Sequence, residues 1–120
     1  MKIGLSSTGN NLESRLDPRF GRTSNFIIYD LENDSYVCLD NTQNLNAAQG
    51  AGIQSAQNLI NAGAEAIITG NVGPKAYQTL SAAGVEIFLS SAVTIKEAIE
   101  SFKQGKLVKS NSNNVEGHWI

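Results

Sequence analysis

Cysteine and histidine are almost absent from this chain of 120 residues, which contains one of each, Cys38 and His118. A single cysteine excludes an intrachain disulfide. It also excludes a zinc or iron–sulfur site built from four cysteines of one chain. A nucleophilic pair of cysteine or serine with histidine would have to use His118, and the sequence contains no recognisable triad or pair of catalytic carboxylates.

Excess positive charge and long apolar runs are also missing. Nine Lys and Arg against eleven Asp and Glu give a formal net charge of −2 and a pI near 5.3, whereas phosphate backbones select basic surfaces. The apolar runs are far shorter than the ~20 residues that span a bilayer, and the N-terminus has no signal-peptide pattern. We therefore expect a cytoplasmic protein with neither nucleic acid nor a membrane as its partner.

Apolar residues follow two periods along the chain. Strand-like runs occupy 2–8, 25–31 and 35–41, the last two joined as a hairpin, and helical patterns then alternate with short apolar strands at 64–69 and 85–89. The order βββαβαβα predicts an α/β fold with a mixed sheet of about five strands and helices on its faces. The segment "KLVKS" is a candidate short edge strand. We assign residues 1–110 to a single domain and 111–120 to a polar C-terminal tail.

Local signals place the ends of the predicted helices. Pro74 suits the first turn of the second helix, and Thr94 with Glu97 forms a capping box at the start of the third. Gly63 and Gly84 suit the position just after a helix. The apolar face of the first helix is predicted to comprise Ile53, Ala56, Leu59 and Ile60.

Three loops, 9–24, 70–73 and 90–93, leave the carboxyl ends of the predicted parallel strands, where ligands gather in such sheets. Glycines precede two helices: "GAG" at Gly50, Ala51 and Gly52, and "GNVG" at Gly70, Asn71, Val72 and Gly73. A helix N-terminus presents unpaired N–H groups and a partial positive charge, which favour an anion. The alternative is a plain strand-to-helix turn whose glycines supply positive φ and close packing.

The segment "LDPRFGRTSNF" places Arg19 and Arg22 on either side of Phe20 and Gly21. Forked guanidinium donors suit carboxylate, phosphate or sulfide-rich anions, so these four residues are candidates for anion binding. In the alternative interpretation, Asp17 pairs with one arginine to stabilise a turn and Phe20 fills the core.

The two scarce residues have different interpretations. Cys38 lies within the predicted strand "YVCLD", and we predict that it is a small buried hydrophobe. His118, in the terminal "GHW", is either a metal ligand or part of a tail that docks through Trp119.

Several motifs together resemble one family over nearly the whole chain. They are "DPRFGR" after the first strand, "FIIYD", "GAGIQSAQ", "VGPKAYQTLSAAGVEIF", "TIKEAIESFKQGKL" and the terminal "GHW". Their order and spacing are similar to those of the dinitrogenase iron-molybdenum cofactor biosynthesis family. Its members include small nitrogenase-accessory carriers and the orange protein, which holds a mixed molybdenum–copper sulfide cluster without covalent attachment. The resemblance implies a ribonuclease-H-like fold.

The resemblance also implies binding, carriage or assembly of a metal–sulfur cluster (molybdenum–copper, iron–molybdenum or iron–sulfur) rather than catalysis. The chain departs from some carriers in having so few histidine and cysteine ligands, and from larger members in lacking the radical-SAM cysteine motif. We therefore expect a preassembled, anionic, non-covalently bound cluster with at most one or two protein ligands, such as His118 or Cys38. Other cluster-assembly proteins are the expected partners of a monomer or weak dimer. The alternatives are a phosphate- or nucleotide-binding regulatory module and an interaction domain without a small ligand.

Overall fold

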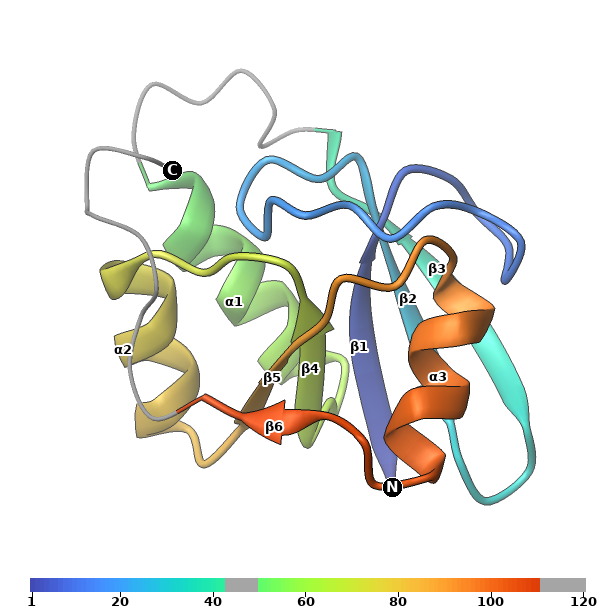
Figure 1. Cartoon of the computed structure of the whole chain (residues 1–120). Helices are drawn as coiled ribbons and strands as arrows, with labels where there is room; N and C mark the ends of the chain where they lie inside the picture. Colours follow the sequence, from blue (N-terminus) through green and yellow to red (C-terminus); the bar gives the residue numbers. More distant parts are fainter. Residues whose placement is uncertain (43–49, 111–120) are drawn as a thin grey trace.

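The computed structural model describes residues 1–42 and 50–110, which form one six-stranded sheet and three helices (Figure 1). The predicted order is confirmed, and the segment 106–110 adds the sixth strand, one more than the number of about five expected. The elements are β1 (Lys2–Ser7), β2 (Asn25–Asp30), β3 (Ser35–Asp40), α1 (Ala51–Asn61), β4 (Ala66–Thr69), α2 (Pro74–Ala82), β5 (Glu86–Leu89), α3 (Ile95–Lys103) and β6 (Val108–Lys109).

The sheet is mixed, with the strand order β3-β2-β1-β4-β5-β6. Strands β1, β4 and β5 are parallel neighbours, because a helix connects β4 to β5 and returns the chain to the same edge. The hairpin partners β2 and β3 and the short β6 pair antiparallel. The carboxyl ends of the three parallel strands therefore share one edge of the sheet, hereafter the carboxyl edge.

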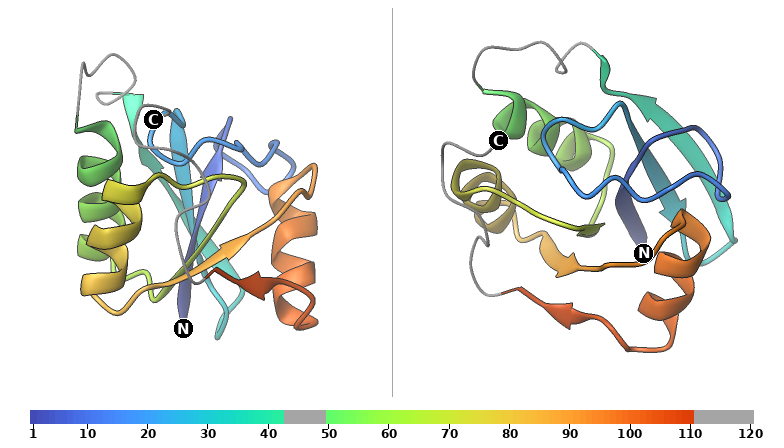
Figure 2. Two further views of the ribbon diagram at one scale, coloured as in Figure 1. Left: turned by 60° about the vertical axis from the view of Figure 1, so that its left-hand side comes forward. Right: turned by 45° about the horizontal axis from the view of Figure 1, so that its top comes forward.

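Helices cover both faces of the sheet: α1 and α2 lie on one side and α3 lies on the other (Figure 2). Strand β2 shows how the sequence serves both layers, because alternate residues of a strand point to opposite faces. Phe26 and Ile28 join the core cluster under α1 and α2, whereas Ile27 and Tyr29 join the cluster under α3.

Two burial predictions are wrong. Cys38 is exposed, because β3 is the edge strand and its face on the α3 side lies beyond the helix that covers the centre of the sheet. Ile53 is 41% exposed, because α1 buries a different stripe at its start, which includes Ala51 and Ser55. Farther along α1 the prediction holds, since Ala56 and Leu59 are fully buried and Ile60 packs partly against the core; the stripe shifts only in the first turn.

The predicted helix boundaries are confirmed where capping chemistry set them. Pro74 is the first residue of α2, and Gly63 and Gly84 follow their helices with φ of 87° and 78°. The hydroxyl of Thr94 accepts the N–H of Glu97 at 3.2 Å at the start of α3. These signals act within one or two turns of the chain, so the sequence contains them in full.

Candidate functional site

Residues 17–22, which we call the arginine loop, lie across the carboxyl edge of the sheet. In Figure 1 the long connection between β1 and β2 passes along the same end of the molecule at which α1 and α2 begin. The loop contacts the turn after β4 on one side and the first turn of α1 on the other. The fold therefore brings together three of the segments that the sequence singled out: 17–22, 50–52 and 70–73.

The contact with the β4–α2 turn depends on backbone proximity. The Phe20 N–H donates to the carbonyl of Asn71 at 3.3 Å, and the Asn71 side-chain amide donates to the Pro18 carbonyl at 3.2 Å. A Cβ atom on Gly70 would lie 2.7 Å from the Cα of Pro18, which no real side chain tolerates. Gly70 is therefore needed for close approach, and it is not among the glycines with positive φ.

The contact with α1 follows the same principle. A Cβ atom on Gly21 would lie 3.1 Å from both the amide nitrogen and the Cα of Gly52. The buried Ser55 hydroxyl of α1 lies 3.5 Å from the Gly21 carbonyl, so the helix also contacts the inner side of the loop. Phe20 is fully buried and packs on Phe26 with ring centroids 5.2 Å apart. It fills the core, as in the alternative interpretation, so its side chain does not line the surface where an anion would bind.

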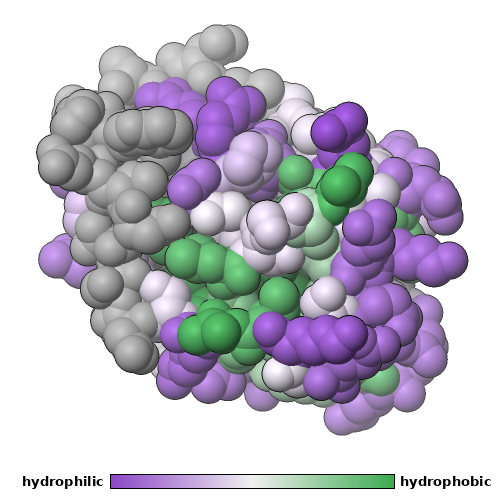
Figure 3. All heavy atoms as spheres, in the orientation of Figure 1, coloured by the Kyte–Doolittle hydropathy of each residue, from purple (hydrophilic) through white to green (hydrophobic). Residues whose placement is uncertain are grey.

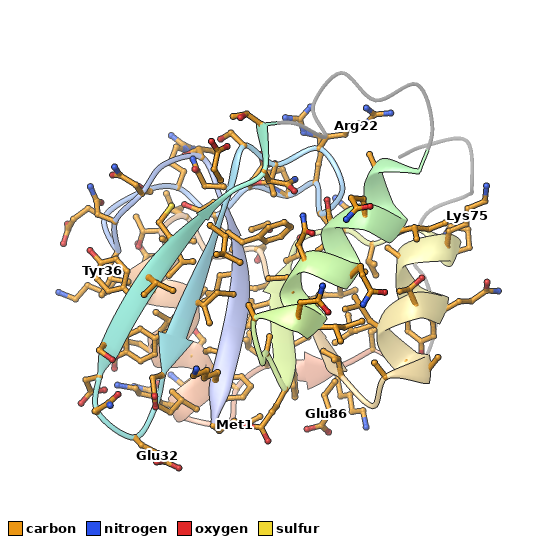
Figure 4. The ribbon with its side chains drawn as sticks, turned by 180° about the vertical axis from the view of Figure 1, so that it is seen from behind. Met1, Arg22, Glu32, Tyr36, Lys75 and Glu86 are labelled. Atoms are coloured by element: carbon orange, nitrogen blue, oxygen red, sulfur yellow. The ribbon has the colours of Figure 1, made fainter. Side chains whose placement is uncertain are left out.

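The two arginines differ in their surroundings. Asp17 is buried and accepts the main-chain N–H of Arg19 at 2.9 Å and its Nε at 3.5 Å. This confirms that Asp17 pairs with one arginine and stabilises the turn. The Arg19 side chain is nevertheless 54% exposed, so the rest of its guanidinium faces outward. Arg22 is half-buried beside the start of α1 and lies on the same end of the molecule as Lys75 in α2 (Figure 4).

Sequence reasoning missed a buried polar layer beneath the arginine loop. The Ser6 hydroxyl at the end of β1 donates to the Asp17 carbonyl at 2.6 Å and contacts the Thr69 hydroxyl, at the end of β4, at 2.8 Å. All three residues are nearly inaccessible to solvent. The signal was present in the sequence, because hydroxyl residues end two strands that are otherwise apolar, where a polar side chain needs a buried partner.

A second set of polar residues continues this layer toward α1. The Asn41 side chain donates to the Thr23 carbonyl at 2.9 Å and to the Ser55 hydroxyl at 3.1 Å, and the Thr23 hydroxyl donates to the Ser7 carbonyl at 2.8 Å. Among the described residues, every buried side-chain nitrogen or oxygen has a hydrogen-bond partner. A fully satisfied buried network fixes one geometry, so the arginine loop is held in place from below.

Helices α1 and α2 begin at this edge without side-chain caps. Their N-cap residues are Gly50, with φ of 81°, and Gly73, and neither helix has an acidic residue in its first turn. Within the part of the chain that the structure describes, no acceptor takes the N–H of Gly52 or that of Lys75. Each helix start therefore contributes N–H donors and partial positive charge to the edge that carries the two arginines.

The third predicted loop, 90–93, does not join this group. Together with α3 and β6 it lines a separate hollow of about 540 Å³, whose walls include Ser90, Ser101 and Lys106. Figure 3 shows apolar side chains at the surface of one face of the molecule. Among the exposed apolar residues, Val93 in this loop is 53% exposed, and Val108, which lines the hollow, is 80% exposed. The candidate site is thus confined to the arginine loop, the start of α1 and the β4–α2 turn.

The donors at the carboxyl edge are N–H groups and guanidinium groups, which suit an anion. Within residues 1–42 and 50–110, no group of three or more His, Cys, Asp or Glu side chains could hold a metal ion. His118 lies outside the described residues, so its role as a metal ligand stays a prediction. No helix among the described residues is long and apolar enough to cross a membrane.

Comparison with known proteins identifies the family. The family described as "Dinitrogenase iron-molybdenum cofactor" matches residues 1–105. The chain belongs to this family. An uncharacterized protein from Methanocaldococcus jannaschii is a relative of this chain, 38% identical over 112 residues that cover 91% of each chain. The family is linked by its description to the iron-molybdenum cofactor of dinitrogenase.

Two solved structures of similar sequence have the same fold. The apo form of the orange protein from Desulfovibrio gigas is 34% identical, with a TM-score of 0.92 over 95% of this chain and 96% of its own. A NifB-like protein from Thermotoga is 36% identical, with a TM-score of 0.85 over 97% and 98% of the two chains. The predicted fold class and family are confirmed.

Proposed function

We propose that this protein binds and carries a preassembled, anionic metal–sulfur cluster as its cargo, in cofactor assembly or metal handling, without catalysing a reaction. The observation that carries the proposal is the meeting of the arginine loop with the uncapped starts of α1 and α2 at one edge of the sheet. Membership of a family linked to the iron-molybdenum cofactor supports this choice among possible anions.

The chemistry of the donors favours an anion that is already assembled before it binds. Main-chain N–H groups of helix starts and guanidinium forks form charge-assisted hydrogen bonds, each worth about 1.5–3 kcal/mol when one partner is charged. Sulfide and oxide atoms on the outside of a cluster accept such bonds without replacing its internal ligands. The cluster is therefore bound non-covalently by Arg19 and Arg22, by the N–H groups in the first turns of α1 and α2, and by the shape of the surface around them.

The buried layer of Ser6, Thr69, Asn41 and Ser55 supports a site that exists before the cargo arrives. Because these side chains are satisfied within the protein, they hold the arginine loop without competing for the cargo. Binding then orders few groups, which lowers its entropic cost. Molybdenum–copper, iron–molybdenum and iron–sulfur clusters all satisfy this description, and the titration below distinguishes the molybdenum–copper type from the iron–sulfur type.

Anaerobic titration of the purified protein tests the proposal. Tetrathiomolybdate with copper(I), and separately an iron–sulfur cluster source, are added, and the mixture is passed through a desalting column. Ligand-to-metal absorption that elutes with the protein is the expected result. Absorption found only in the small-molecule fraction, for both metal types, would rule out the carrier function.

A phosphate- or nucleotide-binding function is the second candidate, because helix starts with glycine caps also suit phosphate. The two functions are separated by colour, since a sulfide cluster absorbs visible light and a nucleotide does not. Inorganic phosphate and ATP are added to the loaded protein at increasing concentration. Displacement of the cluster by ATP at micromolar concentration, with a rise in the thermal midpoint, would favour the nucleotide function.

A further inference from the structure

The two outermost strands of the sheet, β6 and β3, differ in length and in composition. Strand β6 has only two residues, and Lys109 forms half of it. A short edge strand that carries a lysine resists pairing with another chain. Strand β3 has six residues, "SYVCLD", with no Lys, Arg, Pro or Gly. Its register with β2 runs through six successive pairs without a bulge, and its one charged residue, Asp40, is the last residue of the strand.

The outer main-chain groups of β3 follow from the hydrogen-bond pattern of the hairpin. The N–H of Asn41 donates to the Ser24 carbonyl at 2.9 Å, and this pair lies in the same register as the ladder between β2 and β3. Hydrogen-bonded pairs alternate along an antiparallel ladder. The N–H and C=O groups of Tyr36, Cys38 and Asp40 therefore point away from β2, toward the open side of the sheet.

The side chains on this edge are largely apolar and exposed. Tyr36 is 39% exposed and Val37 is 59% exposed, and Cys38 is also at the surface. Val37 and Leu39 lie on the face covered by α1 and α2, because they pair with Ile28 and Phe26 of that core cluster. An open ladder of this length, flanked by apolar side chains, is suited to accept one more antiparallel strand.

We propose that β3 pairs with β3 of a second copy of this chain, antiparallel and centred on Cys38, so that two sheets join into one. In this register the outward main-chain groups meet one another, since Cys38 faces Cys38 of the partner subunit and Tyr36 faces Asp40 of the partner subunit. Val37 then lies opposite Leu39 of the partner subunit, and the symmetry repeats this apolar pair on the other side of the axis. Apolar cross-strand pairs are the units that stabilise such a ladder.

Two features favour a second copy in this register: the placement of the acidic residues and the symmetry of the pairing. Shifting the centre to Val37 would oppose Asp34 to Asp40 of the partner subunit, and like charges directly opposite each other destabilise a sheet. Centring on Cys38 leaves no acidic residue opposite another. A two-fold pairing also covers the β3 edge of both copies, so the assembly stops at a dimer. Because a single pair of strands buries little area, the dimer is weak and depends on concentration.

Disulfide cross-linking tests the register. Hydrogen-bonded pairs in antiparallel strands have Cα atoms about 5.5 Å apart, within the range of a disulfide. Diamide accepts the two protons and two electrons that the two Cys38 thiols release as their S–S bond forms. Partial desolvation and the carboxylate of Asp40 raise the pKa of the Cys38 thiol, so the reaction is run at about pH 9 to populate the thiolate. The expected product is a covalent dimer that reductant reverses.

The matched control moves the thiol along the same exposed strand. In the double variant Cys38→Ser with Ser35→Cys, the two thiols of the proposed dimer lie about 20 Å apart, at ~3.3 Å per residue, and cross-link only by collision. We expect the natural chain to cross-link about tenfold faster than this variant, given the millimolar effective concentrations of paired groups. Equal rates would overturn the proposed register.

Sedimentation under reducing conditions tests association itself. The natural chain and Cys38→Ser should both gain average mass as concentration rises, whereas Cys38→Lys, which opposes two ammonium groups at the axis, should stay monomeric. A constant monomer mass for the natural chain at the highest concentration overturns the proposal. Amide protection of Tyr36 and Cys38 only when a foreign extended peptide is added would also overturn it, in favour of a foreign strand. The proposed dimer does not depend on cluster binding. If the cluster titration fails, the cross-linking and sedimentation results still test the dimer.

Discussion

The start of α3 and the starts of α1 and α2 lie at the same end of the sheet, but their main-chain N–H groups have different fates. At α3 the N–H of Ile95 donates to the Ser14 carbonyl at 2.9 Å and that of Lys96 donates to the Leu12 carbonyl at 2.9 Å. The N–H of Glu97 donates to the hydroxyl of Thr94, the N-cap residue. At α1 and α2 the N-cap is a glycine, with no side-chain cap and no acidic residue in the first turn.

The difference shows how one long loop serves two purposes. Residues 12–16 close the start of α3, because the carbonyl groups of Leu12 and Ser14 accept its first N–H groups, and the Leu16 N–H donates to the Val93 carbonyl at 3.0 Å just before it. Residues 17–22 approach α1 and the β4–α2 turn through Gly21 and Gly70 and leave the first N–H groups of α1 and α2 unsatisfied by side-chain caps. A helix start that is closed stabilises the fold, whereas one that is left uncapped retains its attraction for an anion.

Removing the arginine charge should have the largest effect on uptake. Arg19→Gln with Arg22→Gln deletes two guanidinium groups and keeps polar bulk. Cluster affinity should fall between several-fold and a hundredfold, because the lost charge-assisted hydrogen bonds contribute roughly 1–3 kcal/mol. The thermal midpoint should move little. Arg15→Gln is the control, because Arg15 is exposed and lies in the half of the loop that serves α3. Unchanged affinity with a large loss of stability would mean that the arginines only build the turn.

Filling the close approach at Gly70 should disturb both stability and uptake. A methyl group in Gly70→Ala would press on the backbone of Pro18, which cannot rotate away, so unfolding free energy should drop by about 1–3 kcal/mol. The displaced arginine loop should also bind cluster more weakly. In the control Gly9→Ala the new methyl group meets the side chain of Ser14, whose hydroxyl can rotate away and whose Cβ, 3.2 Å distant, needs only a small shift. Similar losses of stability in denaturant titrations of both variants would contradict the prediction.

Reversing one charge at an uncapped helix start should separate stability from binding. Lys75→Glu adds an acidic residue to the first turn of α2, which should stabilise the helix by about 0.3–1 kcal/mol. The same charge should weaken anion binding by about two- to fivefold. Lys96 occupies the equivalent second position of α3, so Lys96→Glu should leave uptake unchanged. If both variants lose affinity equally, the effect is one of net charge and the three helix starts do not differ.

A substitution at the turn of the β2–β3 hairpin should change stability at neutral pH but leave cluster uptake unchanged. Asp34 accepts the Tyr29 hydroxyl at 2.7 Å and the Lys103 ammonium at 3.1 Å, and these bonds hold the pKa of Asp34 below its ordinary value. A lowered pKa stabilises the fold above the ordinary value of about 3.9, and this contribution disappears as pH falls through the lowered pKa. Asp34→Asn, which tolerates the φ of 54° at this position, should therefore lower the thermal midpoint slightly at neutral pH, and the difference should shrink as the pH falls through the lowered pKa of Asp34. Cluster uptake at neutral pH should match that of the natural chain.

Much of the fold was predictable because its signals are local. The alternation of apolar residues in β2 reports two covered faces, and the stop glycines Gly63 and Gly84 mark helix ends within one turn. The candidate segments were predicted for the same reason, since a glycine before a helix and an arginine beside a turn are visible in a few residues. The exposure of Cys38 was not predictable from its own strand, because it depends on which strand forms the sheet edge.

The sequence by itself determined the order of the elements, the helix ends and the scarcity of cysteine and histidine ligands, because each follows from composition or from spacing within a few residues. Only the tertiary structure decided that Gly70 serves the approach of Pro18, that Gly21 serves the approach of Gly52, and that Ser6 pairs with Thr69. These partners lie about 30 to 60 residues apart in the chain, and nothing in either local segment specifies the other. The carboxyl edge of a parallel sheet is where such distant segments meet, because every parallel strand delivers its following loop to the same side.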